Sequence, residues 1–189
     1  MAFSAAVQRR EIHRRSINMT VYARDDGLYD IEAHLVDTKP FAFPLLARSE
    51  PLPAGAPLHD LSLRVTVNEH YVVKSIEASA DATPFDLCTE AESALSPLIG
   101  ERIAAGWSSM IKQRLQSSSC CTHLRELLIP IGTAAIQGIN GLRREGQVSV
   151  DASQTNVKID SCYAFARDRE VIRLYWPGDF KPKCNKEAG

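Results

Sequence analysis

Four short runs of alternating apolar and polar residues constrain the fold of this chain more than any other feature. In the first run, Ile17, Met19 and Val21 alternate with polar residues, which is the period of a half-buried β-strand. The segment 25–27, Asp-Asp-Gly, follows with turn chemistry, and its glycine can take the positive φ that a tight hairpin requires. The sequence therefore predicts a β-hairpin that begins near residue 16.

The second run supplies the other strand of that hairpin. Between residues 29 and 35 the apolar side chains fall on one face, and Asp30, Glu32 and His34 fall on the opposite face. Residues 61–67 alternate in the same way, and residues 71–80 are typical of a fourth, less regular strand. These runs predict a four-stranded, or larger, antiparallel sheet with meander connections.

The middle of the chain has the spacing of helices. Apolar residues recur every three or four positions between Leu95 and Leu115, with Gly100 and Gly106 as interruptions. A third helix is expected from Thr122, because one apolar stripe runs on to Ile139, and a proline within it is expected to bend the helix. The fold class is therefore α+β, with the sheet packed against about three helices.

The remaining segments are irregular. The segment 40–57 contains five prolines, and long loops in compact domains often border functional sites. After residue 146, three short stretches, 148–150, 157–159 and 171–175, are interpreted as extended pieces. We expect a single domain over residues 1–189, with an N-terminal arm to about residue 14 and a C-terminal tail from about residue 178.

Composition excludes several classes of function. A formal net charge of −1 and the absence of a long basic or aromatic-rich surface segment argue against nucleic acid and membrane as partners. The five cysteines follow no disulfide framework, and the N-terminus lacks a secretory signal pattern, so we expect reduced thiols and a cytoplasmic protein. Dinucleotide, P-loop and nucleophile-elbow motifs are missing from the sequence.

The first candidate site is Leu58-His59-Asp60, where the proline-rich loop enters a strand. His59 can act as a general base because imidazole titrates near neutral pH, and Asp60 is a nearby carboxylate. The structural alternative is a histidine that pairs with a backbone carbonyl, with Asp60 capping the loop.

The second candidate site is the segment 120–124, Cys-Cys-Thr-His-Leu, at the start of the third helix. Free backbone N–H groups there favour an anion and lower the pKa of a thiol. In the structural alternative, Thr122 is the helix N-cap and Cys121 is a small buried residue. His123 need not lie on the apolar stripe, which favours a functional role.

Two further possibilities use the same region. Cys120, Cys121 and His123 lie close in sequence, but no standard metal-ligand spacing is present, and no metal or other cofactor is expected. Asp37 and Lys39 end the second strand and are expected to form a surface ion pair, with Lys39 as a Schiff-base nucleophile as the alternative.

Several motifs follow one another along the chain, among them Asp37-Thr38-Lys39, Leu58-His59-Asp60 and Cys121-Thr122-His123-Leu124. In this order they resemble a bacterial family of unknown function, domain-of-unknown-function family 2889. Cys120 stands where the family motif has a glycine. The matching segments cover most of residues 24–137; they are Arg24–Glu32, Asp37–Lys39, Leu58–Asp60 with Arg64, Cys88, Leu98–Gly100, Gly106–Trp107 and Cys121–Leu127.

The resemblance implies an enzyme of aromatic-compound catabolism, a lyase that releases formaldehyde from a lignin-derived aromatic compound without a cofactor. We assign His59, Asp60 and His123 to catalysis, and the substrate-binding set is Tyr29, Lys39, Arg64, Cys121 and Thr122. The alternatives are a noncatalytic protein that binds a small aromatic ligand and a metal-dependent enzyme. A homo-oligomer is compatible with the sequence.

Overall fold

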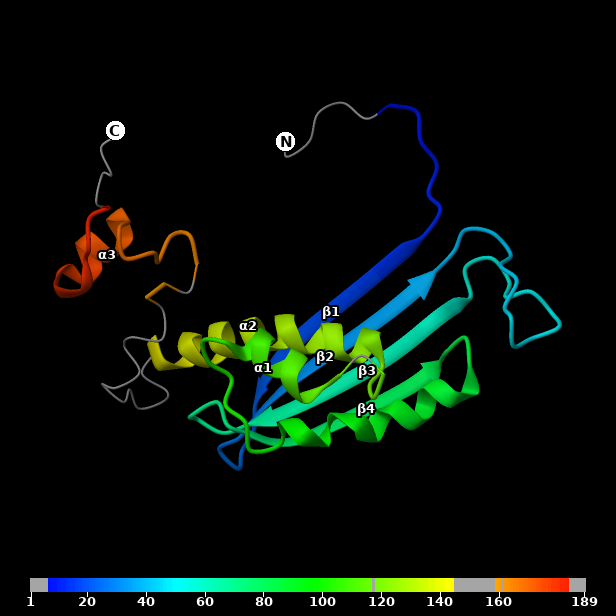
Figure 1. Cartoon of the computed structure of the whole chain (residues 1–189), viewed down its shortest axis with the longest axis horizontal. Helices are drawn as coiled ribbons and strands as arrows, with labels where there is room; N and C mark the ends of the chain where they lie inside the picture. The colour runs from blue at the N-terminus through cyan, green and yellow to red at the C-terminus, as the bar shows by residue number, and fades with distance from the viewer. Residues whose placement is uncertain (1–6, 117, 145–158, 161, 184–189) are drawn as a thin grey trace. The chain divides into compact units, whose positions relative to one another are not determined.

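The computed structural model describes residues 7–116, 118–144, 159–160 and 162–183. The chain divides into two compact units, residues 1–141 and 142–189. The first unit contains the sheet and most of the helical residues (Figure 1). The prediction that the whole chain forms a single domain stays a prediction.

The sheet has four antiparallel strands in the order β1-β2-β3-β4, as the alternating runs predicted. Their bounds are β1 Arg14–Ala23, β2 Tyr29–Thr38, β3 Pro57–Val67 and β4 Val73–Ala82. Gly27 in the first hairpin has a φ of 81°, as the turn chemistry required. The fourth strand begins two residues later than predicted, because Tyr71 has a φ of 63° in the preceding turn.

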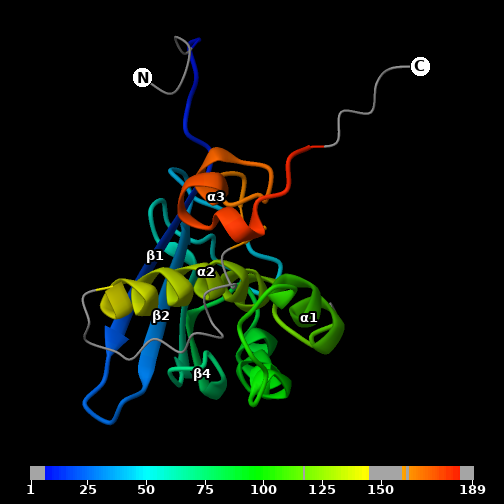
Figure 2. The same ribbon diagram turned by 90° about the vertical axis from the view of Figure 1, so that its left-hand side faces the viewer.

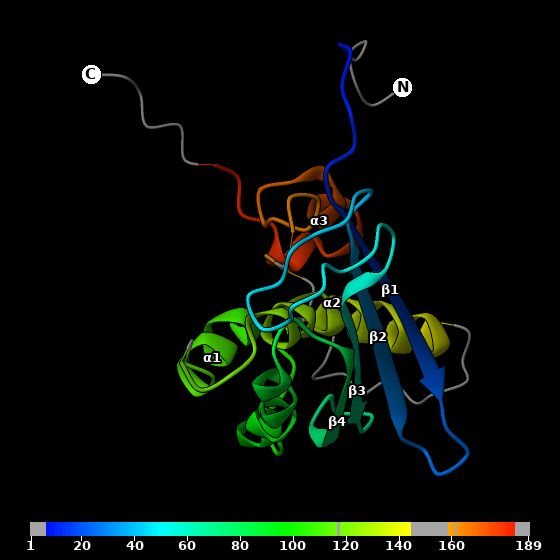
Figure 3. The ribbon, with the colours of Figure 1, turned by 90° about the vertical axis from the view of Figure 1, so that its right-hand side faces the viewer.

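Helices cover one face of this sheet. The 3₁₀ helix η1 spans Asp86–Leu98, α1 spans Trp107–Arg114, and α2 spans Thr122–Arg144. Figure 2 shows α2 crossing the strands on one face, and the opposite view in Figure 3 shows the other face. The predicted α+β class, with an antiparallel sheet packed against about three helices, is therefore confirmed.

The core lies between the helices and the sheet. Tyr29, Ile31 and Leu35 of β2 are buried on the helix-facing side, and so is every second residue of β3 from Leu61 to Val67. The apolar stripe of α2 covers them and includes Leu124, Leu127, Leu128, Ile131, Ala135 and Ile139. Trp107 of α1 joins this layer and donates its indole N–H to the Leu128 carbonyl at 2.7 Å.

The second unit corrects one prediction. Residues 171–175 were expected to be extended, but Glu170–Tyr175 form the helix α3, followed by the 3₁₀ helix η3, Pro177–Asp179. Ile172 is the buried position of α3, and Arg173 Nε donates to Glu170 at 2.8 Å, an i,i+3 pair that supports a helix. The stretch 148–150 lies outside the described residues, and so does 157–159 apart from Ile159.

Candidate active site

A row of polar side chains crosses the helix-facing side of the sheet at the end of β2. Strand register pairs Asp37 with Arg15 of β1 and with His59 of β3. Directly opposed residues in antiparallel strands lie on the same face, with Cβ atoms about 5 Å apart. The backbone register alone therefore gathers a guanidinium, a carboxylate and an imidazole at the edge of the apolar core.

Asp37 is the centre of this row. Its side chain is only 1% exposed, and Arg15 donates to both carboxylate oxygens at 2.8 Å. Nδ1 of His59 lies 3.0 Å away, and Nε2 of His13 lies 3.3 Å away. Burial raises the pKa of Asp37, but the hydrogen bond and charge of Arg15, together with His59, lower it by more than burial raises it. The pKa of Asp37 is therefore below its ordinary value. Asp37 is therefore a buried carboxylate anion.

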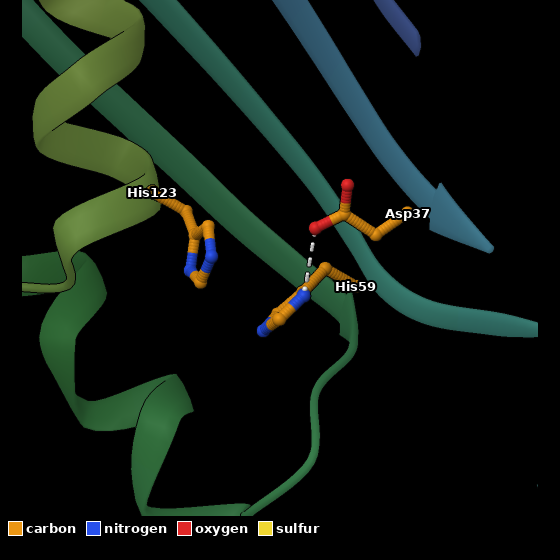
Figure 4. A group of neighbouring side chains, drawn as sticks. All are labelled: Asp37, His59 and His123. Atoms are coloured by element: carbon orange, nitrogen blue, oxygen red, sulfur yellow. Dashed lines mark hydrogen bonds and ion pairs between the residues drawn. The ribbon is translucent and has the colours of Figure 1, made fainter. Parts of the chain in front are cut away.

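His123 brings a second imidazole to this row from the first turn of α2. The ring centroids of His59 and His123 are 4.0 Å apart, and the ring planes are tilted by 41° (Figure 4). Burial and the charge of His123 lower the pKa of His59 more than Asp37 raises it. His59 is therefore neutral near pH 7, and the adjacent carboxylate favours the tautomer with the proton on Nδ1. Its Nε2 lone pair is then free to accept a proton.

Cys121 forms the N-cap of α2 and adjoins the imidazole pair. Its carbonyl accepts the first helical hydrogen bond from Arg125 at 3.0 Å, and its Sγ lies 3.9 Å from Nδ1 of His123. Burial raises the pKa of this thiol, but hydrogen bonds from the His123 ring and from the backbone N–H groups of Leu124 and His123 lower it overall. The cap was expected at Thr122, whose side chain is exposed instead.

Three of these residues could hold a metal ion. Asp37, His59 and His123 each offer one ligand atom, and those atoms all lie within 4.8 Å of one another. Two imidazoles and a carboxylate suit divalent transition metals. The cluster can therefore serve either as an acid–base group or as a metal ligand set.

The structure places two predicted site residues on the other face of the sheet. Asp60 follows His59 in β3 and so points the opposite way, where it pairs with His34 at 2.6 Å. Arg64 lies on that same face, with its Nε donating to Glu32 at 2.9 Å. His59 and Asp60 are therefore not brought together, and the carboxylate beside His59 is Asp37.

Tyr29 and Lys39 also lie away from the imidazole pair. Tyr29 is 5% exposed in the core and pairs with Val67 at the opposite end of β2. The Lys39 Nζ lies 4.7 Å from the ring centroid of Phe43, so its neighbours are aromatic. The expected surface ion pair between Asp37 and Lys39 is wrong, because Asp37 is buried against Arg15, His13 and His59.

Two hollows lie near these segments. The proline-rich loop borders a cavity of about 360 Å³ through Leu45, Arg48 and Leu52. A polar groove of about 400 Å³ lies on the face of the sheet opposite the imidazole pair; its polar side chains are Asn18, Thr20, Glu32, His34, Ser62, Arg64, Glu77 and Ser79. In this groove Arg64 pairs with Glu32 and Glu77, and His34 pairs with Asp60, which lies outside the lining.

Sequence reasoning missed Arg15, His13 and the buried state of Asp37. A signal for Asp37 was present, because it continues the buried alternation of Ile31, Ala33 and Leu35 by one more step.

No helix in the described part of the chain has the length and apolar character needed to cross a membrane.

Comparisons with known proteins identify the family but no function. No curated protein and no solved structure matches the chain. One family model, described as a protein of unknown function (DUF2889), matches residues 13–137, which include His13, Arg15, Asp37, His59 and His123. The chain therefore belongs to the DUF2889 family.

Proposed function

We propose that this chain is a small-molecule lyase that uses acid–base catalysis on a lignin-derived phenolic compound and releases formaldehyde without a cofactor. One observation carries the proposal: two imidazoles lie 4.0 Å apart beside a buried carboxylate that contacts one of them. A histidine that donates Nδ1–H to a carboxylate exposes Nε2 as a base, and the carboxylate stabilises the imidazolium that forms. A cytoplasmic location and a small aromatic substrate are part of this proposal.

The proposed reaction is a retro-aldol cleavage. His59 Nε2 takes the proton of a substrate hydroxymethyl group, the C–O bond becomes the C=O of formaldehyde, and the adjacent C–C bond breaks. The substrate for this step is a quinone methide, formed when a p-hydroxybenzylic alcohol loses its benzylic hydroxyl and its phenol proton as water. The electron pair released from the C–C bond moves through this conjugated system and ends on the quinone methide oxygen, which becomes a phenolate. The His123 ring, with Thr122 and the helix N-terminus beside it, is placed to donate a hydrogen bond to that oxygen. Asp37 balances the positive charge that develops on His59.

The test is formaldehyde release from a panel of lignin-derived phenolic dimers. We expect His59→Ala and His123→Ala to lower turnover by roughly 10²- to 10⁴-fold, the usual contribution of an acid–base group. His34→Ala is the matched control, because His34 is 46% exposed on the opposite sheet face and pairs with Asp60.

Two results would contradict this function. If wild type and both site variants release formaldehyde equally, the assigned residues are wrong. Saturable binding of the phenolic panel with no product after long incubation would favour a noncatalytic binding protein instead.

A further inference from the structure

We propose that Asp37, His59 and His123 together bind one divalent transition-metal ion of the zinc type. One atom from each residue already lies within 4.8 Å of the others. Four-coordinate zinc, with ligands at about 2.0–2.1 Å, holds its ligand atoms about 3.3 Å apart. Nδ1 of His59 and Oδ2 of Asp37 are 3.0 Å apart, close to that spacing, so the remaining adjustment falls mainly on the His123 ring.

The donor set fits this class of ion. Imidazole nitrogen and carboxylate oxygen are common zinc ligands, whereas sites for magnesium and calcium use oxygen donors almost entirely. Three protein ligands leave a coordination position for water or a solute, as in catalytic rather than structural zinc sites. His59 is 13% exposed, so an ion can reach the cluster from solvent.

The contacts of Asp37 indicate where an ion can bind on its carboxylate. A carboxylate has about four lone-pair positions. Arg15 and His13 approach three of them around Asp37, and His59 Nδ1 faces the fourth, which an ion bound between Asp37 and His59 takes. Arg15 also lies 3.5 Å from Glu126, so two carboxylates face this one guanidinium. Arg15 thereby orients the carboxylate that binds the metal, without binding the metal itself.

This site goes beyond the proposed lyase activity and uses the same residues. A bound ion occupies a ring lone pair of His59 and replaces its contact with Asp37, so the ion and the proton compete for this histidine. We therefore expect added zinc to inhibit formaldehyde release, and we expect a chelator to restore it.

The experiment is calorimetric titration of the chelator-treated full-length chain with zinc chloride. We expect one ion per chain, loss of that binding in His59→Ala and His123→Ala, and unchanged binding in His34→Ala. Arg15→Gln should weaken zinc affinity by roughly 10- to 100-fold, the usual effect of losing an outer-shell partner. Circular dichroism confirms that each variant is folded, and any variant that is not is replaced by His59→Gln or His123→Gln.

Cobalt serves as a spectroscopic probe of the same site. Visible d–d bands without a thiolate charge-transfer band would identify nitrogen and oxygen ligands and would exclude the neighbouring Cys121 as a ligand. Absence of zinc binding, or equal binding by the folded His59 and His34 variants, overturns the metal site. A strong thiolate band overturns the assigned ligand set.

The two proposals fail separately. Formaldehyde release by metal-free protein that does not bind zinc would leave the lyase standing and remove the metal site. Zinc binding without any formaldehyde release would do the reverse. Activity that appears only after zinc is added would support the metal site and overturn the cofactor-free mechanism.

Discussion

Asp37 organises the candidate site through a single buried charge. Its carboxylate sits on the apolar face of the sheet, where an unpaired anion costs several kcal/mol. Arg15 compensates the charge, and the remaining oxygen lone pairs contact His59 and His13. These contacts fix the orientation of the His59 ring. The position of His123, the other neighbour of His59, is determined by the start of α2.

The first prediction concerns the pH dependence of stability. The folded pKa of Asp37 is depressed, so its stabilisation is present above the unfolded pKa of about 3.9 and is lost as the pH falls through the folded pKa. We expect Asp37→Asn to lower the free energy of unfolding by about 1–3 kcal/mol at pH 7. The difference from wild type should shrink below about pH 4.

Urea unfolding at pH 7, 5 and 3 measures this difference. Asp60→Asn is the control, because Asp60 is 28% exposed in its pair with His34, and exposed ion pairs contribute about 0–1 kcal/mol. A difference for Asp37→Asn that stays constant down to pH 3 would contradict the assigned ionisation.

The second prediction compares two adjacent thiols. The pKa of Cys121 is lowered by the hydrogen bonds at the helix start, which outweigh its burial, whereas burial raises the pKa of Cys120. Both side chains are half-buried, so access to reagent is similar. Since the thiolate is the nucleophile, iodoacetamide at pH 7 should modify Cys121 faster than Cys120.

Peptide mass spectrometry of Cys120→Ser and Cys121→Ser proteins measures the two rates separately. His123→Ala should slow the modification of Cys121, because it removes the ring that hydrogen-bonds to the thiol. Equal rates for the two cysteines would show that the helix start does not activate Cys121.

Sequence alone could locate the two histidines but not their common carboxylate. His59 and His123 stood at predicted element ends, and the structure brings them together. To pair Asp37 with His59, one must know the register of β2 and β3, which are joined by the irregular loop. That register also shifts between Asp37 and Thr38. Adjacency in sequence favoured Asp60 instead, although neighbouring residues of a strand point to opposite faces.

At the scale of elements, α2 holds the helical layer close to the sheet. Gly138 faces Val21 of β1 so closely that an added Cβ would lie 2.8 Å from the Val21 Cγ1. At Gly132 an added Cβ would lie 2.7 Å from the Trp107 ring of α1. These two glycines therefore let α2 approach β1 and α1 closely. Glycine is a poor helix former, so close packing outweighs helix propensity at these positions.

The third prediction tests this close approach. Gly138→Ala should lower the free energy of unfolding by about 1–3 kcal/mol, the usual cost of overpacking. Gly141→Ala is the matched control in the same helix, since nothing lies within 4 Å of its added Cβ, and it should gain up to about 1 kcal/mol from helix propensity. Urea unfolding measures both values, and equal effects would contradict the packing of α2 on β1.

Alternation identified all four strands. One face of β2 and β3 is buried and the other is more exposed, whereas β1 keeps the alternating sequence although most of its residues are exposed. The same argument failed at α3, where Glu170–Tyr175 is too short for period 2 and period 3.6 to be distinguished. Element type was thus predictable where an alternating run belonged to a strand of ten or more residues.

For the whole molecule, the first unit contains nearly all of the described hydrophobic core. Of the buried apolar side chains in the described residues, every one except Ile172 precedes residue 141. The family match ends at residue 137, and Asp37, His59 and His123 all lie within it. The first unit therefore contains the candidate site, the family match and nearly all of the described core.

The fourth prediction is that a chain ending at Gly141 folds by itself. It retains the sheet, α1 and the buried stripe of α2, so we expect native-like far-UV circular dichroism and one cooperative thermal transition. A chain ending at Gln116 is the control, because it lacks α2 and exposes the apolar face that Leu127, Leu128 and Ile131 cover. We expect this shorter chain to aggregate or to bind a hydrophobic dye without a cooperative transition. If the longer fragment behaves in the same way, residues 142–189 supply stability that the core of the first unit lacks.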